Sequence, residues 1–286
     1  MKDYIIYTDS SCDFSKEDIA KRGIGCADLT FRFDGEDREY ANYDMPITGF
    51  YQKMREGGVA KTAAVNTEVF KSAFEEAIRS GLDVLYIGFS SGLSTTCNSA
   101  RIAINELKEE YPEAKIIAVD TLAASAGIAL LIDMILDKKA EGATIEEAAK
   151  FAEDNKMKIA HRFTVDDLVY LKRGGRVSGA TALVGNLLGI KPILHVDNEG
   201  HLVSVGKVRG RHASLVALAD KLGETAIEGT RVYISHSDCY ADAEKLAEII
   251  KTKYSYDVQL ITDVGPVIGA HSGPGTMALF FVASER

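Results

Sequence analysis

The chain has 286 residues, of which 46% are hydrophobic, and its formal net charge is -9 at pH 7. This size and composition are sufficient for one large or two modest globular domains with an apolar core. The net negative charge argues against a general affinity for nucleic acid or anionic membranes, because such binding depends on many Lys and Arg contacts with phosphates.

Short apolar runs in the first half of the chain predict parallel strands. They lie at residues 4–9, 84–88 and 115–120 and show no clean alternation, as expected for strands covered on both faces. Helical periodicity separates them, over 95–112 and from Thr67, a candidate helix cap, to Gly81. This order indicates βαβ units, whose functional loops lie at the carboxyl ends of the strands.

The second half follows a different pattern after a helical region at 144–158. Two strand-like runs flank the turn residues 197–200, which predicts an antiparallel hairpin. Further strands are expected at 231–236, 257–262 and 277–283, with a helix at 242–254. We therefore predict two α/β domains: residues 1–160 with a parallel sheet, and residues 161–286 with a mixed or antiparallel sheet.

Membrane spans, secretion and metal sites are not indicated. The most apolar stretch, 122–136, is interrupted by Asp133 and is shorter than the roughly 20 residues of a membrane span, so we expect a buried helix and no stable membrane insertion. The N-terminal residues lack a secretory h-region, which favours the cytoplasm. Four scattered cysteines have no metal-ligand spacing, and we expect reduced thiols and no metal: Cys12, Cys26, Cys97 and Cys239.

The stretch "GFSSGLSTTC", residues 88–97, joins a predicted strand to a predicted helix. Its first five residues match the G-x-S-x-G elbow of serine esterases around Ser90, and Asp263 and His271 follow in the required order. No HGGG-like segment precedes it, and an elbow normally follows more strands. No P-loop or dinucleotide motif is present. The hydroxyls also suit a helix cap or an anion socket, because a helix N-terminus presents unpaired N–H groups.

Two further segments carry candidate ligand residues. "KTAAVN" places Thr62 in a turn of small residues before a helix, and "GAHSGPG" places His271 in a turn rich in Gly and Pro before an apolar strand. Each segment by itself is typical of a structural turn. Their chemistry becomes informative only in combination with the serine loop.

In combination, five segments resemble the DegV family of fatty-acid-binding proteins, over essentially the whole chain: "TDSSCD", "KTAAVN", "SSGLSTT", "LKRGGRVSGATALVGNLLGIKPIL" and "HSGPG". The resemblance implies two α/β domains with a long-chain fatty acid in an apolar tunnel between them. It implies a carrier that is not catalytic alone and needs no cofactor. Its partner is a separate bacterial fatty acid kinase that converts the bound carboxylate to an acyl phosphate for phospholipid synthesis.

The same resemblance assigns roles to individual residues. It implies that Thr62 and Ser94 bind the carboxylate, that His271 lies close to the head group, and that Ser90 shapes the loop. The chain departs from the family pattern at two places. Ala63 and Ala64 follow Thr62 where the family usually has Ser and Gln, and Thr95 follows Ser94 where Gly is common. Both changes make the loops more apolar or bulkier and bear on acyl-chain preference and head-group geometry.

Two arginines are expected at the kinase partner or at the phosphate during transfer. The resemblance points to Arg176 and Arg209, and each lies in a local basic group of an otherwise acidic chain. A planar guanidinium suits the geometry of phosphate oxygens. If the fatty acid interpretation fails, the alternative is a serine esterase that uses Ser90 with His271.

Overall fold

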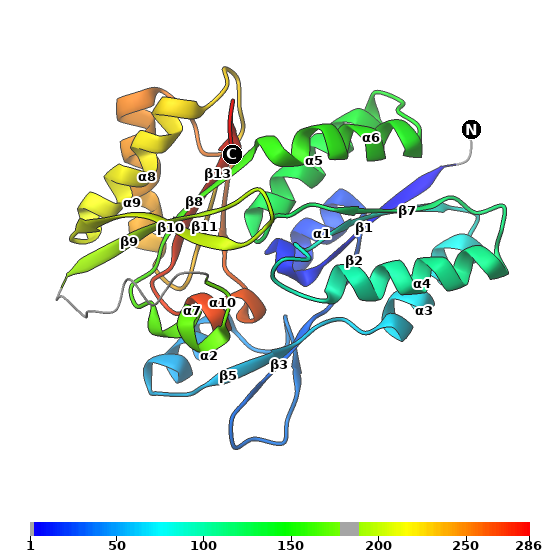
Figure 1. Ribbon diagram of the computed structural model, residues 1–286, viewed down its shortest axis with the longest axis horizontal. Coiled ribbons are helices and arrows are strands. Elements are labelled where there is room, and N and C mark those ends of the chain that lie inside the picture. Colours follow the sequence, from blue (N-terminus) through cyan, green and yellow to red (C-terminus); the bar gives the residue numbers. More distant parts are fainter. Residues whose placement is uncertain (1–2, 178–188) are drawn as a thin grey trace.

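The computed structural model describes residues 3–177 and 189–286. Residues 178–188, which form the middle of the longest DegV-like segment, lie outside the described part. The described chain forms three sheets with helices around them, a mixed α/β architecture as predicted (Figure 1). Sheets A and B are built from strands before residue 159, and sheet C from Ile159 onward.

Sheet A has four parallel strands in the order β2-β1-β6-β7. Their bounds are β1 Tyr4–Asp9, β2 Gly25–Ala27, β6 Asp83–Gly88 and β7 Ile116–Asp120. The helices of this half are α1 Lys16–Arg22, α3 Thr67–Arg79, α4 Thr96–Glu110, α5 Ala126–Ala140 and α6 Ile145–Asn155, with a 3-10 turn at Ser10–Cys12. The three predicted parallel strands are therefore confirmed. Their apolar runs are unbroken because helices pack against both faces of the sheet.

The starts of the helices follow local capping chemistry. The side chain of Asn66, not that of Thr67, accepts the N–H of Val69 and caps α3. The prediction of Thr67 as the cap was thus wrong by one residue. Thr144 and Glu147 form a reciprocal capping box that begins α6. A capping box of this kind satisfies two otherwise unpaired N–H groups, which explains why α6 begins where the sequence suggested.

Sheet B is a small antiparallel sheet in the order β4-β3-β5, and the sequence analysis did not anticipate it. Its strands are β3 Thr30–Phe33, β4 Tyr40–Ala41 and β5 Ala60–Ala63, and α2 Ile47–Arg55 packs beside it in the lower part of the view (Figure 1). Thr62 lies on β5 opposite Phe31. The prediction that Thr62 lies in a turn was therefore wrong, and strand pairing holds its backbone instead.

Sheet C has six strands in the order β10-β9-β8-β13-β11-β12, and it is mixed. Their bounds are β8 Ile159–Thr164, β9 Ile190–Val196, β10 Leu202–Arg209, β11 Val232–His236, β12 Leu260–Asp263 and β13 Met277–Val282. The hairpin predicted around residues 197–200 is confirmed as β9 and β10. All three further strands predicted in this half are also present, although β12 is shorter than expected.

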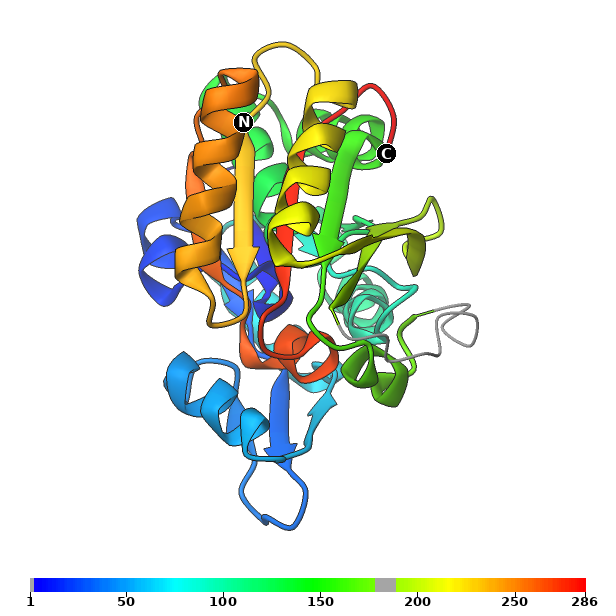
Figure 2. The same cartoon turned by 90° about the vertical axis from the view of Figure 1, so that its left-hand side faces the viewer.

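Four helices accompany sheet C, together with a 3-10 turn at Lys156–Lys158 that precedes β8. They are α7 Val169–Gly174, α8 Arg211–Thr225, α9 Tyr240–Tyr254 and α10 Pro266–Ser272. Figure 2 shows α8 and α9 side by side over one face of the sheet. His271 lies in the last turn of α10. The expectation of an irregular turn at His271 was wrong, because Pro266 suits the first turn of a helix and Gly273 follows its end.

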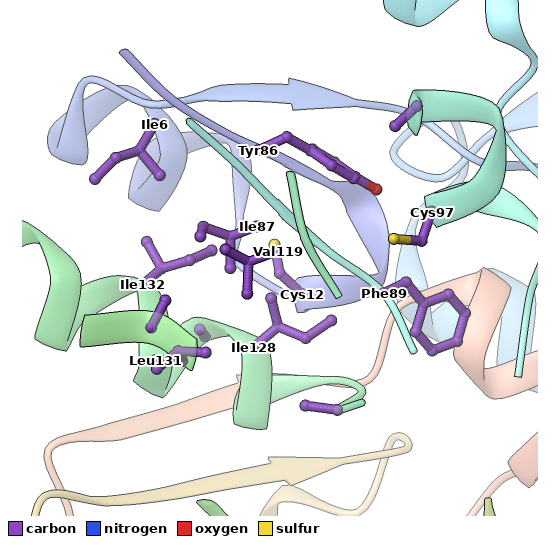
Figure 3. Packing of buried hydrophobic residues seen from close by; sticks show 14 of the residues in the cluster. Ile6, Cys12, Tyr86, Ile87, Phe89, Cys97, Val119, Ile128, Leu131 and Ile132 are labelled. Carbon is purple, nitrogen blue, oxygen red and sulfur yellow. The ribbon is translucent and has the colours of Figure 1, made fainter. Parts of the chain in front are cut away.

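The predicted buried helix is α5, and it joins the two halves of the molecule. It contacts β6 of sheet A and also β8, β11 and β13 of sheet C. Ile128 and Ile132 point toward Ile87 and Val119 of sheet A (Figure 3), and these four side chains and that of Leu131 are essentially inaccessible to solvent. One apolar core therefore extends from sheet A into sheet C, and the domain boundary near residue 160 stays a prediction.

Within the described residues, no helix combines the length and apolar character needed to cross a bilayer. All four cysteines are unpaired thiols. Residues 3–177 and 189–286 contain no group of three or more His, Cys, Asp or Glu side chains that could hold a metal ion.

Candidate functional site

A cavity of about 550 Å³ lies where the first and second halves of the chain meet. The first half of the chain contributes β5, the loop before α4 and the start of α5 to the part of the cavity wall that the structure describes. The second half contributes β8, β13, α7, α10 and the β9–β10 hairpin. Thr62, Ser94, Arg176 and His271 all contribute to this wall. Four of the five predicted site residues are thus brought to one cavity from distant parts of the sequence.

Thr62 and His271 form the central polar contact of the cavity. Thr62 Oγ1 lies 2.9 Å from Nε2 of His271. Burial, assisted by the positive charge of Arg176, lowers the pKa of His271 to about 4. The imidazole is therefore neutral at pH 7 and carries a single N–H, on either Nδ1 or Nε2.

The position of that proton decides what Thr62 can offer to a ligand. If Nε2 carries the hydrogen and donates it to Thr62 Oγ1, the hydroxyl hydrogen of Thr62 is free to point into the cavity. If Thr62 instead donates its hydroxyl hydrogen to Nε2, only the lone pairs of its oxygen remain for a ligand. Only the first arrangement, in which His271 orients the Thr62 hydroxyl, lets Thr62 donate to an anion.

Ser94 lies in the loop between β6 and α4, half-buried in the cavity wall. Its Oγ accepts the N–H of Thr96 at 3.2 Å and lies 2.9 Å from Thr96 Oγ1. The turn that precedes α4 thus uses the lone pairs of Ser94, whereas Thr95, at the N-cap position, makes no side-chain cap hydrogen bond. When Thr96 donates its hydroxyl hydrogen, that of Ser94 remains available for an acceptor at the helix N-terminus. The Ser94 side chain can therefore accept the N–H of Thr96 and donate to an anion at the same time.

Ser90 has a different role from Ser94, although only three residues separate them. Its side chain is fully buried, and its Oγ donates to the carbonyl oxygen of Gly200 at 2.9 Å and accepts the N–H of Gly92 at 3.2 Å. Gly200 has a φ of +81°, and a Cβ built there would lie 2.2 Å from Ser90 Oγ. Ser90 therefore fastens the loop to the turn between β9 and β10.

The esterase alternative required Ser90, Asp263 and His271 to come together, and the structure contradicts this. The ring of His271 contacts Thr62. Asp263 instead lies 3.5 Å from Nδ1 of His236. Within the described residues, the hydrogen bonds of Ser90 Oγ go to the carbonyl oxygen of Gly200 and the N–H of Gly92, so the elbow-like sequence does not form a nucleophile elbow.

The two predicted arginines lie in different environments. Arg176 has an exposed side chain that also contributes to the cavity wall, and its Nε donates to the carbonyl oxygen of Leu93 at 3.3 Å. A cation therefore stands beside the serine loop at the rim of the cavity. Arg209 ends β10, is exposed, and lies outside the described cavity wall. The structure thus brings Arg176, but not Arg209, to the candidate site.

Most of the remaining wall is apolar. It includes Phe89, Phe163, Val196, Leu202, Ile268 and Phe280, drawn from both halves of the chain. His161 also lines it, with its ring edge-on to Phe280 at a centroid distance of 5.2 Å and its Nδ1 2.9 Å from the carbonyl oxygen of Ile159. Burial lowers the pKa of His161 well below its usual value. This imidazole is therefore neutral, and the apolar stretch of wall carries no charge from it.

Sequence reasoning missed three polar residues of the wall: Ser125, His161 and Ser272. Ser125 interrupts a run of small apolar residues, and Ser272 directly follows His271. These places in the sequence could have indicated that both serines belong to a site. The indication is ambiguous, because buried serines are also common as helix caps. Ser125 Oγ in fact donates to Oδ2 of Asp13 at 2.5 Å.

Comparison with known proteins agrees with the resemblance seen in the sequence. The family model for uncharacterised proteins of the DegV family matches residues 4–284. A DegV domain-containing protein from Clostridium perfringens is 43% identical over 291 aligned residues, which cover 100% of this chain and 99% of the relative.

Solved structures give the same result. A protein from Thermotoga maritima, described as revealing a fatty acid binding function, is 32% identical with a TM-score of 0.85, covering 99% of this chain and 100% of its own. A stearic-acid-binding protein from Eubacterium ventriosum is 25% identical with a TM-score of 0.88, covering 98% of each chain. The family model and the high identity over the full length agree with the fold, and this chain belongs to the DegV family.

Proposed function

We propose that the protein binds one long-chain fatty acid in this cavity, with the carboxylate at Thr62 and Ser94. The observation that carries the proposal is the composition of the wall. The wall combines hydroxyl groups and Arg176 with a largely apolar remainder, and the described lining includes no Asp or Glu. An anion with a long apolar tail matches both parts. The relatives described as fatty-acid-binding proteins support the same ligand class.

The apolar tail accounts for most of the expected affinity. A tail of about sixteen carbons, at roughly 0.8 kcal/mol for each buried CH₂, contributes on the order of 10 kcal/mol before ordering costs are deducted. The hydroxyls of Thr62 and Ser94 replace hydrogen bonds that the carboxylate makes with water, so their net contribution is smaller. They chiefly fix the orientation of the ligand.

Lipid extraction tests the proposed function directly. We expect the purified protein to carry endogenous long-chain fatty acid, because a largely apolar cavity that buries the tail retains such a ligand during purification. Mass spectrometry of the extracted lipid identifies it, and titration of the delipidated protein with palmitate gives its affinity. Absence of fatty acid from the extract, together with no binding of added palmitate, contradicts the proposal.

We further propose that a separate kinase phosphorylates the bound carboxylate, so that the protein is a substrate carrier. In this step a carboxylate oxygen attacks the γ-phosphorus of kinase-bound ATP, the O–P bond of the acyl phosphate forms, and the bond to ADP breaks. The exposed position of Arg176 at the cavity rim supports this step, because a guanidinium there offsets the charge of the phosphoryl group. Localisation to the cytoplasm stays a prediction.

The two arginines are expected to affect phosphorylation in different ways. Arg209→Ala should leave palmitate affinity unchanged and lower the rate of kinase-dependent acyl phosphate formation severalfold, with a loss that depends on salt, because Arg209 is exposed outside the described cavity wall. Arg176→Ala should lower the rate at every salt concentration. Arg79→Ala, which removes an exposed arginine of α3, serves as the control. Normal phosphorylation in both variants would refute their assignment to transfer or docking.

A further inference from the structure

One face of α10 forms part of the cavity wall. The residues that line it are Val267, Ile268, His271 and Ser272, which make two i,i+4 pairs along the helix. The apolar members, Val267 and Ile268, lie one turn before the polar members. The polar residues therefore share one level of the helix, and His271 identifies that level through its contact with Thr62.

Ser272 is the unexplained member of this face. Its side chain is only 6% exposed, and its Oγ has no hydrogen-bond partner within the described part of the protein. Thr276 Oγ1 donates to the backbone oxygen of Ser272 and leaves the hydroxyl unused. A buried hydroxyl without a partner costs free energy, so a well-packed apolar wall offers no reason for a serine at this position. Because no described residue uses this hydroxyl and Ser272 lines the cavity, the hydroxyl is available to an occupant of the cavity.

We propose that Ser272 Oγ is a further hydrogen-bond donor to the carboxylate of the bound fatty acid. The inference rests on the proposed function. A carboxylate has about four lone-pair sites, and the hydroxyls of Thr62 and Ser94 satisfy two of them. A saturated tail offers no acceptor to a hydroxyl at any point along its length. The level of Ser272 on α10, beside His271, places it with the head group.

The substitution Ser272→Ala removes the hydroxyl with minimal change of shape. We expect it to weaken palmitate binding about tenfold and hexadecanol binding much less, because hydrogen bonds to a charged acceptor are roughly twice as strong as neutral ones. The measured quantity is the dissociation constant of palmitate divided by that of hexadecanol, both determined with delipidated protein. Ser94→Ala is the positive control and should likewise raise the dissociation constant of palmitate relative to that of hexadecanol.

Thermal unfolding of the lipid-free protein separates a ligand role from a structural role. Since the hydroxyl of Ser272 has no protein partner to lose, Ser272→Ala should keep the wild-type Tm or raise it by about 2–4 °C. Ser214→Ala is the matched control: Ser214 is also buried but lies outside the described cavity wall, and its hydroxyl donates to the carbonyl oxygen of Arg211 at 2.7 Å. That variant should lower the Tm while the ratio of dissociation constants keeps its wild-type value.

The outcomes distinguish this inference from the proposed function. If the wild type binds palmitate tightly and Ser272→Ala leaves the ratio of dissociation constants unchanged, the assignment of Ser272 is overturned and fatty acid binding stands. A lower Tm with equal losses for both ligands also overturns it, because that pattern indicates a packing role. Failure of the wild type to bind palmitate and hexadecanol overturns both.

Discussion

Replacing Gly174 by Ala is expected to weaken palmitate binding by at least tenfold. Gly174 ends α7, and a Cβ at this position would lie 2.2 Å from Nδ1 of His271. Such a contact is too short, so either the imidazole or the end of α7 has to move. Because the His271 ring is buried and hydrogen-bonded to Thr62, its displacement removes the group that orients the Thr62 hydroxyl. Calorimetric titration of the delipidated variant measures the loss.

A double-mutant cycle shows whether the effect passes through His271. In the His271→Ala background the side chain that collides with the new methyl group is absent, so Gly174→Ala should cost little additional affinity. The two substitutions are then strongly non-additive. Additive losses, or wild-type affinity in Gly174→Ala, would contradict the role assigned to this close contact.

The second large effect concerns stability and involves Asp13, which lies behind the cavity wall. Its carboxyl group is almost fully buried, with Oδ2 accepting from Ser125 Oγ at 2.5 Å and Oδ1 accepting from the N–H of Gly265 at 2.9 Å. Burial raises the pKa of Asp13 to about 8, with smaller contributions from the charges of Asp263 and Asp9. The carboxyl is therefore largely protonated in the folded protein at neutral pH.

The raised pKa determines the direction of the pH dependence. In the unfolded chain Asp13 has its ordinary pKa near 4, so the folded state binds an extra proton between about pH 4 and pH 8. The stability linked to this proton is fully present below pH 4 and is lost as the pH rises through 8. The slope from this single group is at most about 1.4 kcal/mol per pH unit.

Asp13→Asn should remove this dependence. An Asn amide places a donor NH₂ group and an acceptor oxygen where the protonated carboxyl has its O–H and its C=O, and it cannot ionise. We expect the variant to match the wild type near pH 4 and to become progressively more stable than the wild type up to pH 8, as measured by urea unfolding. Ser235→Ala, which removes a neighbour of Ser125 but retains the carboxyl, should preserve the wild-type slope. Parallel curves for Asp13→Asn and the wild type would show that Asp13 does not titrate in this range.

Local patterns in the sequence were sufficient to predict most of the regular fold. The unbroken apolar runs of β1, β6 and β7 predicted parallel strands because both faces of such a sheet are covered. The turn at residues 197–200 predicted the β9–β10 hairpin. The motifs also indicated the family, and with it the segments in which Thr62, Ser94 and His271 lie. Each of these signals is carried by residues adjacent or nearly adjacent in the chain.

Only the tertiary structure decided which side chains of those segments contact one another. Sheet B escaped prediction because β5 is a four-residue strand containing Lys61 and Thr62, and its pairing with β3 provides the stability that local propensity does not. Ser90 and Ser94 are chemically identical, and their roles diverge because the carbonyl oxygen of Gly200, 110 residues from Ser90, lies against one of them. The contact between Thr62 and His271 spans 209 residues. Periodicity reports which face of an element is buried, whereas a binding site depends on which distant side chains meet, and that is set by packing.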